Sequence, residues 1–293
     1  MVKTIGWIGL GNMGQPMARN LLNGGYRVHV YNRSPEKAID LVEAGAVLAE
    51  NIEELCFDSD IIITMLSDDQ AVKGVFLGEG GLLNGPVSGK LLINMSTVAP
   101  KTSRELQEMS KAVGARFLEA PVSGSIQPAI DGTLLILVGG SDDDFREVQP
   151  LFEQLGKAAL WLGHVSAASY AKLAINYFLA LTLQGLAETV LFAGRYGVSA
   201  KDMLHIVNES ACGSPITKGK SSAILNHAFP ASFALKHMAK DLRLADEQGI
   251  AFPLSTPLID TYQKALQEGL GEEDVMAIIT YLNQQQTTDG ATE

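Results

Sequence analysis

The feature that most constrains this chain is a glycine-rich loop near its N-terminus, directly after an apolar run. Residues 5–8 read Ile-Gly-Trp-Ile, and three glycines follow with the spacing G-x-G-x-x-G. Met13, Met17 and Leu21 then recur every four residues, the period of a helix that packs on a sheet. A strand, a glycine turn and a helix in this order predict a dinucleotide-binding βαβ unit. The loop comprises Gly9, Leu10, Gly11, Asn12, Met13 and Gly14.

Each glycine of this loop has an expected function. Gly9 permits the tight turn, Gly11 lets a pyrophosphate approach the backbone, and Gly14 lets the helix pack closely on the strand. The helix N-terminus then offers N–H groups and partial positive charge to the phosphates. A chance match is the alternative, since the chain holds 29 glycines. The context favours the dinucleotide site, because Gly24 and Gly25 end the helix and an alternating strand over residues 27–31 follows.

The residues after the second strand indicate which dinucleotide binds. Asn32, Arg33 and Ser34 stand where an NAD-binding protein usually carries Asp or Glu to bind the ribose hydroxyl. A carboxylate would repel a 2′-phosphate, whereas the Arg33 fork can pair with it and the two flanking residues can donate hydrogen bonds to its oxygens. The sequence therefore predicts NADP(H). In the alternative, Arg33 is a solvated loop residue and NAD binds without an acidic partner.

Composition limits the remaining classes of partner. A chain of 293 residues with 46% hydrophobic content can bury a large core in about two domains. Its net charge of −11, without any run of Lys and Arg, excludes a nucleic-acid surface. The first 25 residues do not resemble a secretory signal, and no apolar stretch of bilayer-spanning length is evident, so we expect a cytoplasmic protein without a membrane partner. Cys56 and Cys212 match no metal-binding spacing, so we expect free thiols and no metal site.

The pattern along the chain changes once, near residue 164. Before it, short apolar runs alternate with helical stretches, which predicts a Rossmann-type, doubly wound α/β domain over residues 1–164. After it, strand patterns stop, and one helix of unusual length is expected over residues 166–196. We therefore expect an all-α domain over residues 165–287, joined to the first by this helix, and a disordered tail over 288–293. Further helices are expected over residues 200–211, 233–248, 257–268 and 272–286.

Three segments stand where a ligand of such a fold would bind. In open α/β sheets, ligands bind beyond the carboxyl ends of the strands, and the polar segments 94–97 and 119–125 each follow an apolar run. On the long helix, Lys172 and Asn176 are four residues apart and share one face. The alternatives are an ordinary solvated lysine, a surface asparagine, and a simple turn at residues 123–124.

Five motifs that occur together and in order resemble the β-hydroxyacid dehydrogenase family, over about residues 4–285. That family includes 3-hydroxyisobutyrate dehydrogenases, tartronate semialdehyde reductases and glyoxylate/succinic semialdehyde reductases. Ser125, where many relatives have a second glycine, agrees with the glyoxylate/succinic semialdehyde reductase branch, which prefers NADPH. Segments 121–132, 218–220 and 233–237 also resemble that branch. The five motifs are the glycine loop, Asn94–Thr97, Ala120–Gly124, Lys172-Leu173 with Asn176, and Lys240–Leu242.

The resemblance implies a role for each matching residue. Lys172 would be the general acid, and a positive charge beside a developing alkoxide is suited to that role. Ser123 and the backbone around Gly124 would hold a substrate carboxylate, and Asn176 would bind it too or orient the lysine. Asp241 would orient a neighbour or only form an ion pair. The other implied contacts are Thr97 between nicotinamide and substrate, Met65 and Leu66 beside the cofactor, and Phe233 and Lys240 from the helical domain.

The implied activity is NADPH-dependent reduction of small carboxylate-bearing aldehydes, such as glyoxylate or succinic semialdehyde, to hydroxy acids. The alternatives are a 3-hydroxyisobutyrate or 2-hydroxy-3-oxopropionate dehydrogenase, and a catalytically silent relative that acts as an assembly domain. An imine reductase is disfavoured, because that related group generally lacks a lysine at position 172. The long apolar helix exceeds what one small domain covers, so we expect a homodimer or homotetramer.

Overall fold

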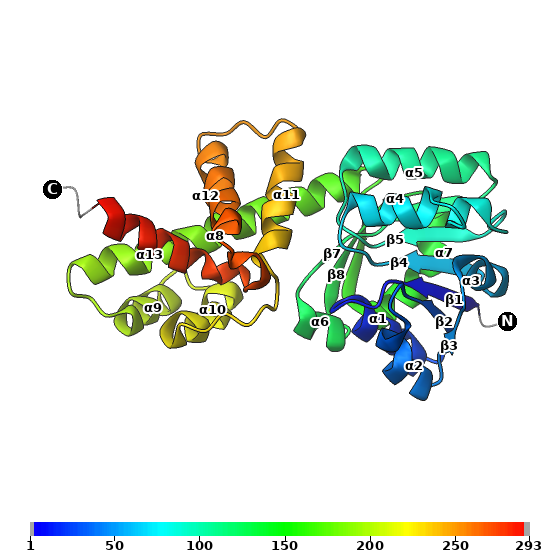
Figure 1. The fold of residues 1–293 in the computed structure, drawn as a ribbon, viewed down its shortest axis with the longest axis horizontal. Helices are drawn as coiled ribbons and strands as arrows, with labels where there is room; N and C mark the ends of the chain where they lie inside the picture. Colours follow the sequence, from blue (N-terminus) through cyan, green and yellow to red (C-terminus); the bar gives the residue numbers. More distant parts are fainter. Residues whose placement is uncertain (1–2, 290–293) are drawn as a thin grey trace. The chain divides into compact units, whose positions relative to one another are not determined.

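The computed structural model describes residues 3–289 and divides into two compact units (Figure 1). The first unit ends at Lys172 and the second begins at Leu173, so the division falls inside the long helix. The domain boundary expected at 164/165 lies just before that helix begins and stays a prediction. The expected disordered tail began at residue 288, but the last described helix of the chain continues to Asp289, so the prediction was wrong for residues 288 and 289. The rest of that tail, residues 290–293, lies outside the described residues.

The first unit is built on a mostly parallel sheet in the order β3-β2-β1-β4-β5-β6-β8-β7, with β9 paired to β8. Neighbouring strands from β3 to β6 are parallel. This arrangement confirms the predicted doubly wound fold. The strands are β1 Thr4–Ile8, β2 Arg27–Tyr31, β3 Val47–Leu48, β4 Ile61–Thr64, β5 Leu91–Asn94, β6 Arg116–Glu119, β7 Val122–Ser123, β8 Leu134–Gly140 and β9 Gly156–Trp161.

Helices cover both faces of this sheet, and the sequence of its central strands reflects that. Ile61 and Ile63 pack in the core beneath α1 and α7, whereas Ile62 packs in a second core with residues of α3, α4 and α5. A strand buried on both faces is a continuous apolar run, which is why β4 and β5 show no alternation. The helical segments are α1 Gly14–Asn23, η1 Pro35–Ala38, α2 Ile39–Glu43, α3 Ile52–Asp58, α4 Asp69–Leu77, η2 Leu82–Asn84, α5 Pro100–Ala112, α6 Ile126–Ile130 and α7 Asp142–Leu155.

Beyond β6 the sheet departs from the parallel pattern. Strand β8 runs antiparallel to both β6 and β7, and parallel to β9. The connection from β7 to β8 holds only the short helix α6, too little chain for the crossover that a parallel return needs. The candidate segment at residues 119–125 therefore lies at the junction between the parallel and antiparallel parts of the sheet.

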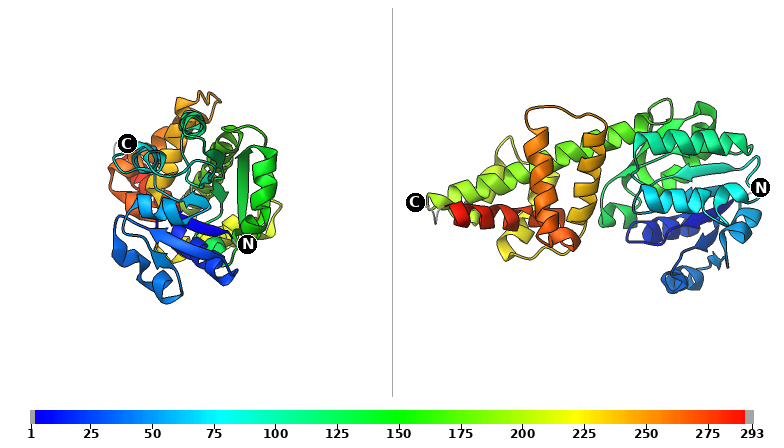
Figure 2. Two further views of the ribbon diagram at one scale, coloured as in Figure 1. Left: turned by 90° about the vertical axis from the view of Figure 1, so that its right-hand side faces the viewer. Right: turned by 45° about the horizontal axis from the view of Figure 1, so that its top comes forward.

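The second unit is all helical, and α8 supplies part of its core. Its buried cluster includes Leu183 and Ala187 of α8, Met238 and Leu242 of α11, and Tyr262 of α12. Figure 2 shows α8 as one unbroken helix. The elements are α8 Ala167–Arg195, α9 Ala200–Glu209, α10 Pro215–Asn226, α11 Leu235–Glu247, α12 Ser255–Gln267, η3 Leu270–Glu272, η4 Val275–Ala277 and α13 Ile278–Asp289.

Helix α8 also corrects one expectation. In the described part of the chain, it is the one helix long and apolar enough, by length and composition alone, to cross a bilayer. The expectation that no stretch reaches this length was wrong, because Lys172, Asn176 and Glu188 interrupt the apolar residues without ending the helix. The core helix of a soluble protein can meet the same criterion; in α8, 28% of the apolar window is buried in this chain, and Leu183 and Ala187 are among its fully buried residues.

Candidate functional site

The glycine loop connects β1 to α1, as predicted, and its three glycines are constrained differently. Gly9 has a φ of +102°, and a Cβ there would lie 2.2 Å from the carbonyl oxygen of Met65. A Cβ on Gly14 would lie 2.0 Å from the carbonyl oxygen of Gly9. The chain's own packing therefore requires both glycines. A Cβ on Gly11 would meet no atom within 4 Å, so only a ligand can explain a requirement for glycine there.

The end of the loop is built to accept an anion. Helix α1 begins at Gly14 with no side-chain cap and no acidic residue in its first turn. Two hydrogen bonds hold the loop in place, from Gly9 N to Tyr31 O at 3.1 Å and from Leu10 N to Asn32 Oδ1 at 3.0 Å. The positive end of a helix dipole, beside the open space at Gly11, fits the pyrophosphate of a dinucleotide.

The three residues after β2 differ in their availability to a ligand. The amide of Asn32 accepts from Leu10 N and donates to Ser34 O at 2.8 Å, so one of its N–H groups is committed within the chain. Arg33 is exposed and makes no hydrogen bond or ion pair with any other described residue. Of the three, Arg33 is the residue best placed to pair with a 2′-phosphate. Asn32 also supports the glycine loop through its bond to Leu10 N, a role that was not predicted from the sequence.

Met65 and Leu66 directly follow β4, and Thr97 follows β5, so these residues lie at the same edge of the sheet as the glycine loop. Asn94 and Ser96 brace them: Thr64 Oγ1 donates to Asn94 Oδ1 at 3.0 Å, and Leu66 N donates to Ser96 Oγ at 2.8 Å. Both bracing side chains are buried. The sequence prediction singled out this segment but did not foresee that Asn94 and Ser96 hold it in place, although polar residues at the end of an apolar strand were a usable signal.

Ser123 lies in β7, opposite Leu135 of β8, and Gly124 follows it with a φ of +139°. A Cβ on Gly124 would lie 2.6 Å from Leu134 Cδ2, so this turn requires glycine. Ser123 is half-buried and Gly124 is exposed, which leaves a hydroxyl and a backbone turn at the surface of the unit.

Lys172 lies in the second turn of α8 and is only 6% exposed. The alternative of an ordinary solvated lysine is therefore wrong. Charged side chains are seldom buried without a specific interaction to offset the lost hydration.

Asn176 and Asp241 meet inside the second unit, where both are 3% exposed. Asn176 Nδ2 donates to Asp241 Oδ2 at 2.5 Å, and Lys240 Nζ lies 3.0 Å from Asp241 Oδ1. Asp241 thus combines the two roles considered for it, because it orients an amide and also pairs with a lysine. Asn176 is not the exposed surface residue of the alternative reading.

Phe233 is half-buried and stacks on His237, with ring centroids 6.2 Å apart and planes at 21°. Burial lowers the pKa of His237, and the charges of Lys240 and Lys236 lower it further. The imidazole is therefore neutral at physiological pH, which permits stacking without a second positive charge beside Lys240.

The structure thus gathers the predicted residues into two groups. The first unit holds the glycine loop, the Arg33 segment, Met65 and Leu66, Thr97, Ser123 and Lys172, and the second holds Asn176, Phe233, Lys240 and Asp241. Within residues 3–289, no group of three or more His, Cys, Asp and Glu side chains is arranged to hold a metal ion.

Comparisons with known proteins agree with this arrangement. Residues 4–163 match the NAD-binding domain of 6-phosphogluconate dehydrogenase, and residues 166–282 match the NAD-binding domain of NADP-dependent 3-hydroxyisobutyrate dehydrogenase. Glyoxylate/succinic semialdehyde reductase 1 of Arabidopsis thaliana is 38% identical over 94% of this chain and 96% of its own length.

Two solved structures are similar over the whole fold, each at 28% sequence identity. The structure of Psf3 in complex with NADP+ and 2-OPP superposes with a TM-score of 0.87, over 95% of this chain and 100% of that one. The 3-hydroxyisobutyrate dehydrogenase of Mycobacterium tuberculosis with L-serine superposes with a TM-score of 0.86, over 96% of this chain and 99% of that one.

Proposed function

Because the chain belongs to the 3-hydroxyisobutyrate dehydrogenase-like family of NAD(P)-dependent oxidoreductases, we propose that it reduces small carboxylate-bearing aldehydes, such as glyoxylate and succinic semialdehyde, to hydroxy acids with NADPH. The observation that carries this proposal is the burial of Lys172, whose position in the family motif is that of the general acid. A sheltered ammonium can deliver a proton without competition from bulk water.

The reaction divides between the cofactor and the chain. When bound, NADPH supplies the hydride that the aldehyde carbon receives. Lys172 then donates a proton to the carbonyl oxygen, so that the alkoxide becomes the hydroxyl of the product. A positive charge aimed at this oxygen stabilises the transition state more than the ground state, which is the condition for a faster chemical step.

The substrate carboxylate has a separate partner in this proposal. The hydroxyl of Ser123 and the N–H groups of the turn at Gly124 are donors, and a carboxylate withdrawn from water needs such donors. These groups hold the substrate and do not transfer a proton.

The preference for NADPH rests on Arg33. This side chain is exposed and uncommitted among the described residues, at the end of β2, where the adenosine ribose lies in proteins of this fold. The A. thaliana relative is named as a reductase of the same two aldehydes, which supports the substrate class.

A substrate panel tests the proposal directly. Glyoxylate, succinic semialdehyde, and the oxidised and reduced forms of 3-hydroxyisobutyrate and 2-hydroxy-3-oxopropionate are each assayed with both cofactors at the nicotinamide absorbance band. We expect the highest kcat/KM for glyoxylate or succinic semialdehyde with NADPH. A preference for 3-hydroxyisobutyrate over both aldehydes would replace the proposal with the second candidate, a 3-hydroxyisobutyrate dehydrogenase, which the match of residues 166–282 favours.

We also propose that the chain forms a homodimer or homotetramer. Within the second unit, α8 exposes Ile175, Phe178 and Phe192 at 42%, 63% and 63%, on a stripe too apolar to face water along a whole helix. Sedimentation at micromolar concentration is expected to show at least a dimer, and Phe178→Glu should shift it toward the monomer. A fully active monomer would contradict this proposal.

A further inference from the structure

Glu119 is a fully buried carboxylate that the proposed reaction does not use. It ends β6 and is 0% exposed. Its Oε1 accepts hydrogen bonds from Ala168 N at 2.9 Å and from Ser169 N at 3.3 Å. Both N–H groups belong to the first turn of α8, so a side chain from the sheet holds the start of the helix that carries Lys172.

Glu119 performs the task of an N-cap from a distant position in the sequence. Helix α8 begins at Ala167, and the N–H groups of its next two residues are those that a neighbouring Ser, Thr or Asp normally satisfies. The other two donors of the turn find backbone acceptors, Ala167 N on His164 O at 3.2 Å and Tyr170 N on Ser166 O at 3.0 Å. The carboxylate also lies at the positive end of the helix dipole, where a negative charge is stabilising.

Two serines extend this contact to a third element. Ser169 Oγ donates to Glu119 Oε2, and Ser169 Oγ lies 3.0 Å from Ser103 Oγ of α5. Since the proton of Ser169 is used toward the carboxylate, Ser103 is the donor in the second bond. All three side chains are buried, so water does not compete for these bonds.

The three linked elements each adjoin a residue of the proposed site. Helix α5 starts shortly after Thr97, β6 leads into Ser123, and Lys172 lies one turn beyond Ser169. We propose that the Glu119–Ser169–Ser103 network is a positioning device, which fixes Lys172 relative to the segments that carry Thr97 and Ser123. This inference rests on the proposed role of Lys172.

Gly139 shows how closely the chain is fitted to this carboxylate. It is the register partner of Glu119 on β8, and a Cβ there would lie 2.5 Å from Glu119 Oε1 and 2.9 Å from His164 O. The absence of a side chain at position 139 therefore leaves room for the Glu119 carboxylate and for the backbone at His164, which leads into α8. Gly139→Ala is a way to disturb the network without altering any of its hydrogen-bonding groups.

The test compares two substitutions of Glu119 at a temperature where circular dichroism shows both variants folded. Glu119→Gln keeps one acceptor for the backbone N–H groups, whereas Glu119→Leu keeps none. We expect kcat for the aldehyde to fall by about tenfold in the first variant and further in the second, because small misplacements of an acid are costly. The KM for NADPH should stay unchanged. A general loss of structure would alter this KM as well as kcat, so a change in kcat alone identifies a positioning effect.

A matched pair of serines on α5 supplies the control. Ser103→Ala removes a network hydroxyl, whereas Ser110→Ala removes a buried hydroxyl that has no hydrogen-bond partner among the described residues. We expect a lower kcat only for Ser103→Ala and for Gly139→Ala. If wild-type kcat survives in Glu119→Gln, Ser103→Ala and Gly139→Ala alike, the positioning role is refuted.

Hydrogen exchange separates this inference from the proposed activity. The amides of residues 168–172 should exchange faster in Ser103→Ala and Glu119→Gln than in wild type or Ser110→Ala, whether or not any aldehyde is turned over. Wild-type protein inactive toward every aldehyde of the panel would refute the proposed function. Unchanged exchange in these amides would refute the network on its own.

Discussion

A lysine ammonium loses much of its hydration on burial, and Lys172 is only 6% exposed. If this charge serves the chemical step, Lys172→Ala should lower kcat by about 10²- to 10⁴-fold, as is usual for a positioned acid. NADPH affinity should change little, because the glycine loop and Arg33 are untouched. Stopped-flow turnover and cofactor titration by fluorescence measure the two quantities separately.

Ser123→Ala is the matched comparison for that variant. A group that holds the substrate carboxylate acts in the ground state and in the transition state alike, so its loss should raise KM about tenfold or more and leave kcat nearly unchanged. If Lys172→Ala keeps near-normal turnover with bound cofactor, the acid is another group, with Lys240 the first to examine.

Arg33 gives a second prediction at the residue scale. Arg33→Asp replaces a charge-assisted pair with repulsion, so NADPH binding should weaken by about 3 kcal/mol, while NADH binding changes much less. Calorimetric titration with each cofactor measures the difference. Arg27→Asp, at the other end of the same strand and also exposed, is the control and should leave both affinities unchanged. Equal losses for the two cofactors in Arg33→Asp would exclude the phosphate contact.

At the scale of elements, the regular parts of the fold were predictable, because their residues follow a strict period. The long helix was predicted over residues 166–196 and is found at Ala167–Arg195, and the second strand matches at Arg27–Tyr31. Strand β3 was missed, since Val47 and Leu48 are both exposed and two residues show no alternation. Helix α10 was missed because glycine and serines dilute its apolar pattern, although the capping box of Ser214 and Thr217, with Pro215 at the first helical position, signals its start.

The helix expected from residue 272 begins only at Ile278, and the reason is a buried ion pair. Lys220 Nζ lies 2.7 Å from Asp274 Oδ1, and Asp274 Oδ2 accepts from Ser232 Oγ at 2.9 Å and from Phe233 N at 3.3 Å. Residue 274 thus fixes the loop that carries Phe233 instead of joining a helix. Partners so distant in sequence cannot be recognised from local pattern, and the same is true of Glu119 and the start of α8.

Breaking this pair should destabilise the second unit. Asp274→Asn leaves Lys220 without its counter-charge at a site where the lysine side chain is 12% exposed, which should cost about 3 kcal/mol. Both tryptophans, Trp7 and Trp161, lie in the first unit, so urea unfolding followed by circular dichroism should shift more than unfolding followed by fluorescence.

Glu272→Gln is the control for Asp274→Asn. It removes the exposed ion pair with Lys236 from the same loop and should change the unfolding free energy by less than about 1 kcal/mol. Equal shifts in unfolding free energy for the two variants would show that the buried Lys220–Asp274 pair contributes no more to stability than the exposed Lys236–Glu272 pair.

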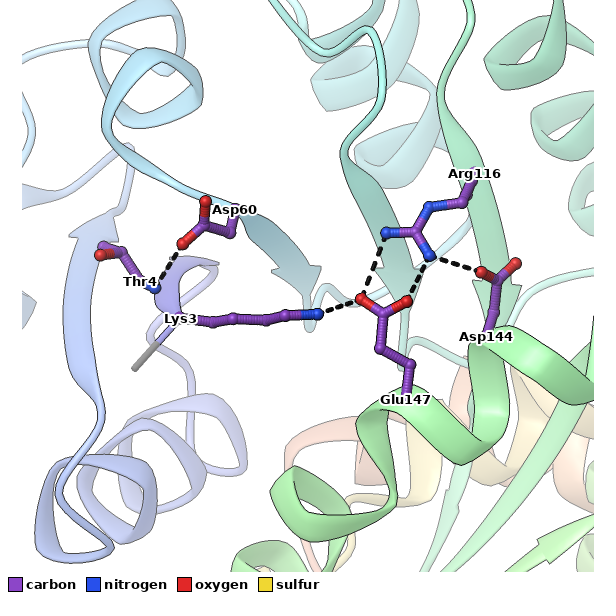
Figure 3. Close-up of polar contacts among 6 residues, drawn as sticks. All are labelled: Lys3, Thr4, Asp60, Arg116, Asp144 and Glu147. Atoms are coloured by element: carbon purple, nitrogen blue, oxygen red, sulfur yellow. Dashed lines mark hydrogen bonds and ion pairs between the residues drawn. The ribbon is translucent and has the colours of Figure 1, made fainter. Parts of the chain in front are cut away.

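At the scale of the whole first unit, the two ends of the strands differ: candidate ligand-binding residues follow the carboxyl ends, and stabilising ion pairs lie at the amino ends. The amino ends of its strands carry an ion-pair network, in which Arg116 Nη1 lies 2.5 Å from Glu147 Oε2 and 2.7 Å from Asp144 Oδ1, and Lys3 also contacts Glu147 (Figure 3). Hydrogen bonds from Arg116 and Lys3 lower the pKa of Glu147 to about 2. The glycine loop, Met65, Leu66 and Thr97 follow the carboxyl ends of the strands, at the opposite end of the sheet from this network.

This separation predicts a stability effect without a catalytic one. A lowered carboxyl pKa stabilises the fold above the unfolded value near 4.5, and this contribution is lost as pH falls toward 2. Glu147→Gln should therefore lower the unfolding free energy at pH 7 by about 1 kcal/mol, and the difference from wild type should vanish near pH 2. The kcat should not change. Glu153→Gln, on the same helix with no hydrogen bond or ion pair among the described residues, should show no such pH-dependent difference.

The unequal constraints on the glycine loop have a consequence for how such proteins diverge. Gly9 and Gly14 are held by contacts inside the chain, so a descendant that no longer needed a dinucleotide would still have to keep them in order to fold. Gly11 is under no such obligation. In descendants that lose dinucleotide binding, we therefore expect the first substitutions of the loop at position 11, while the glycines at positions 9 and 14 are retained.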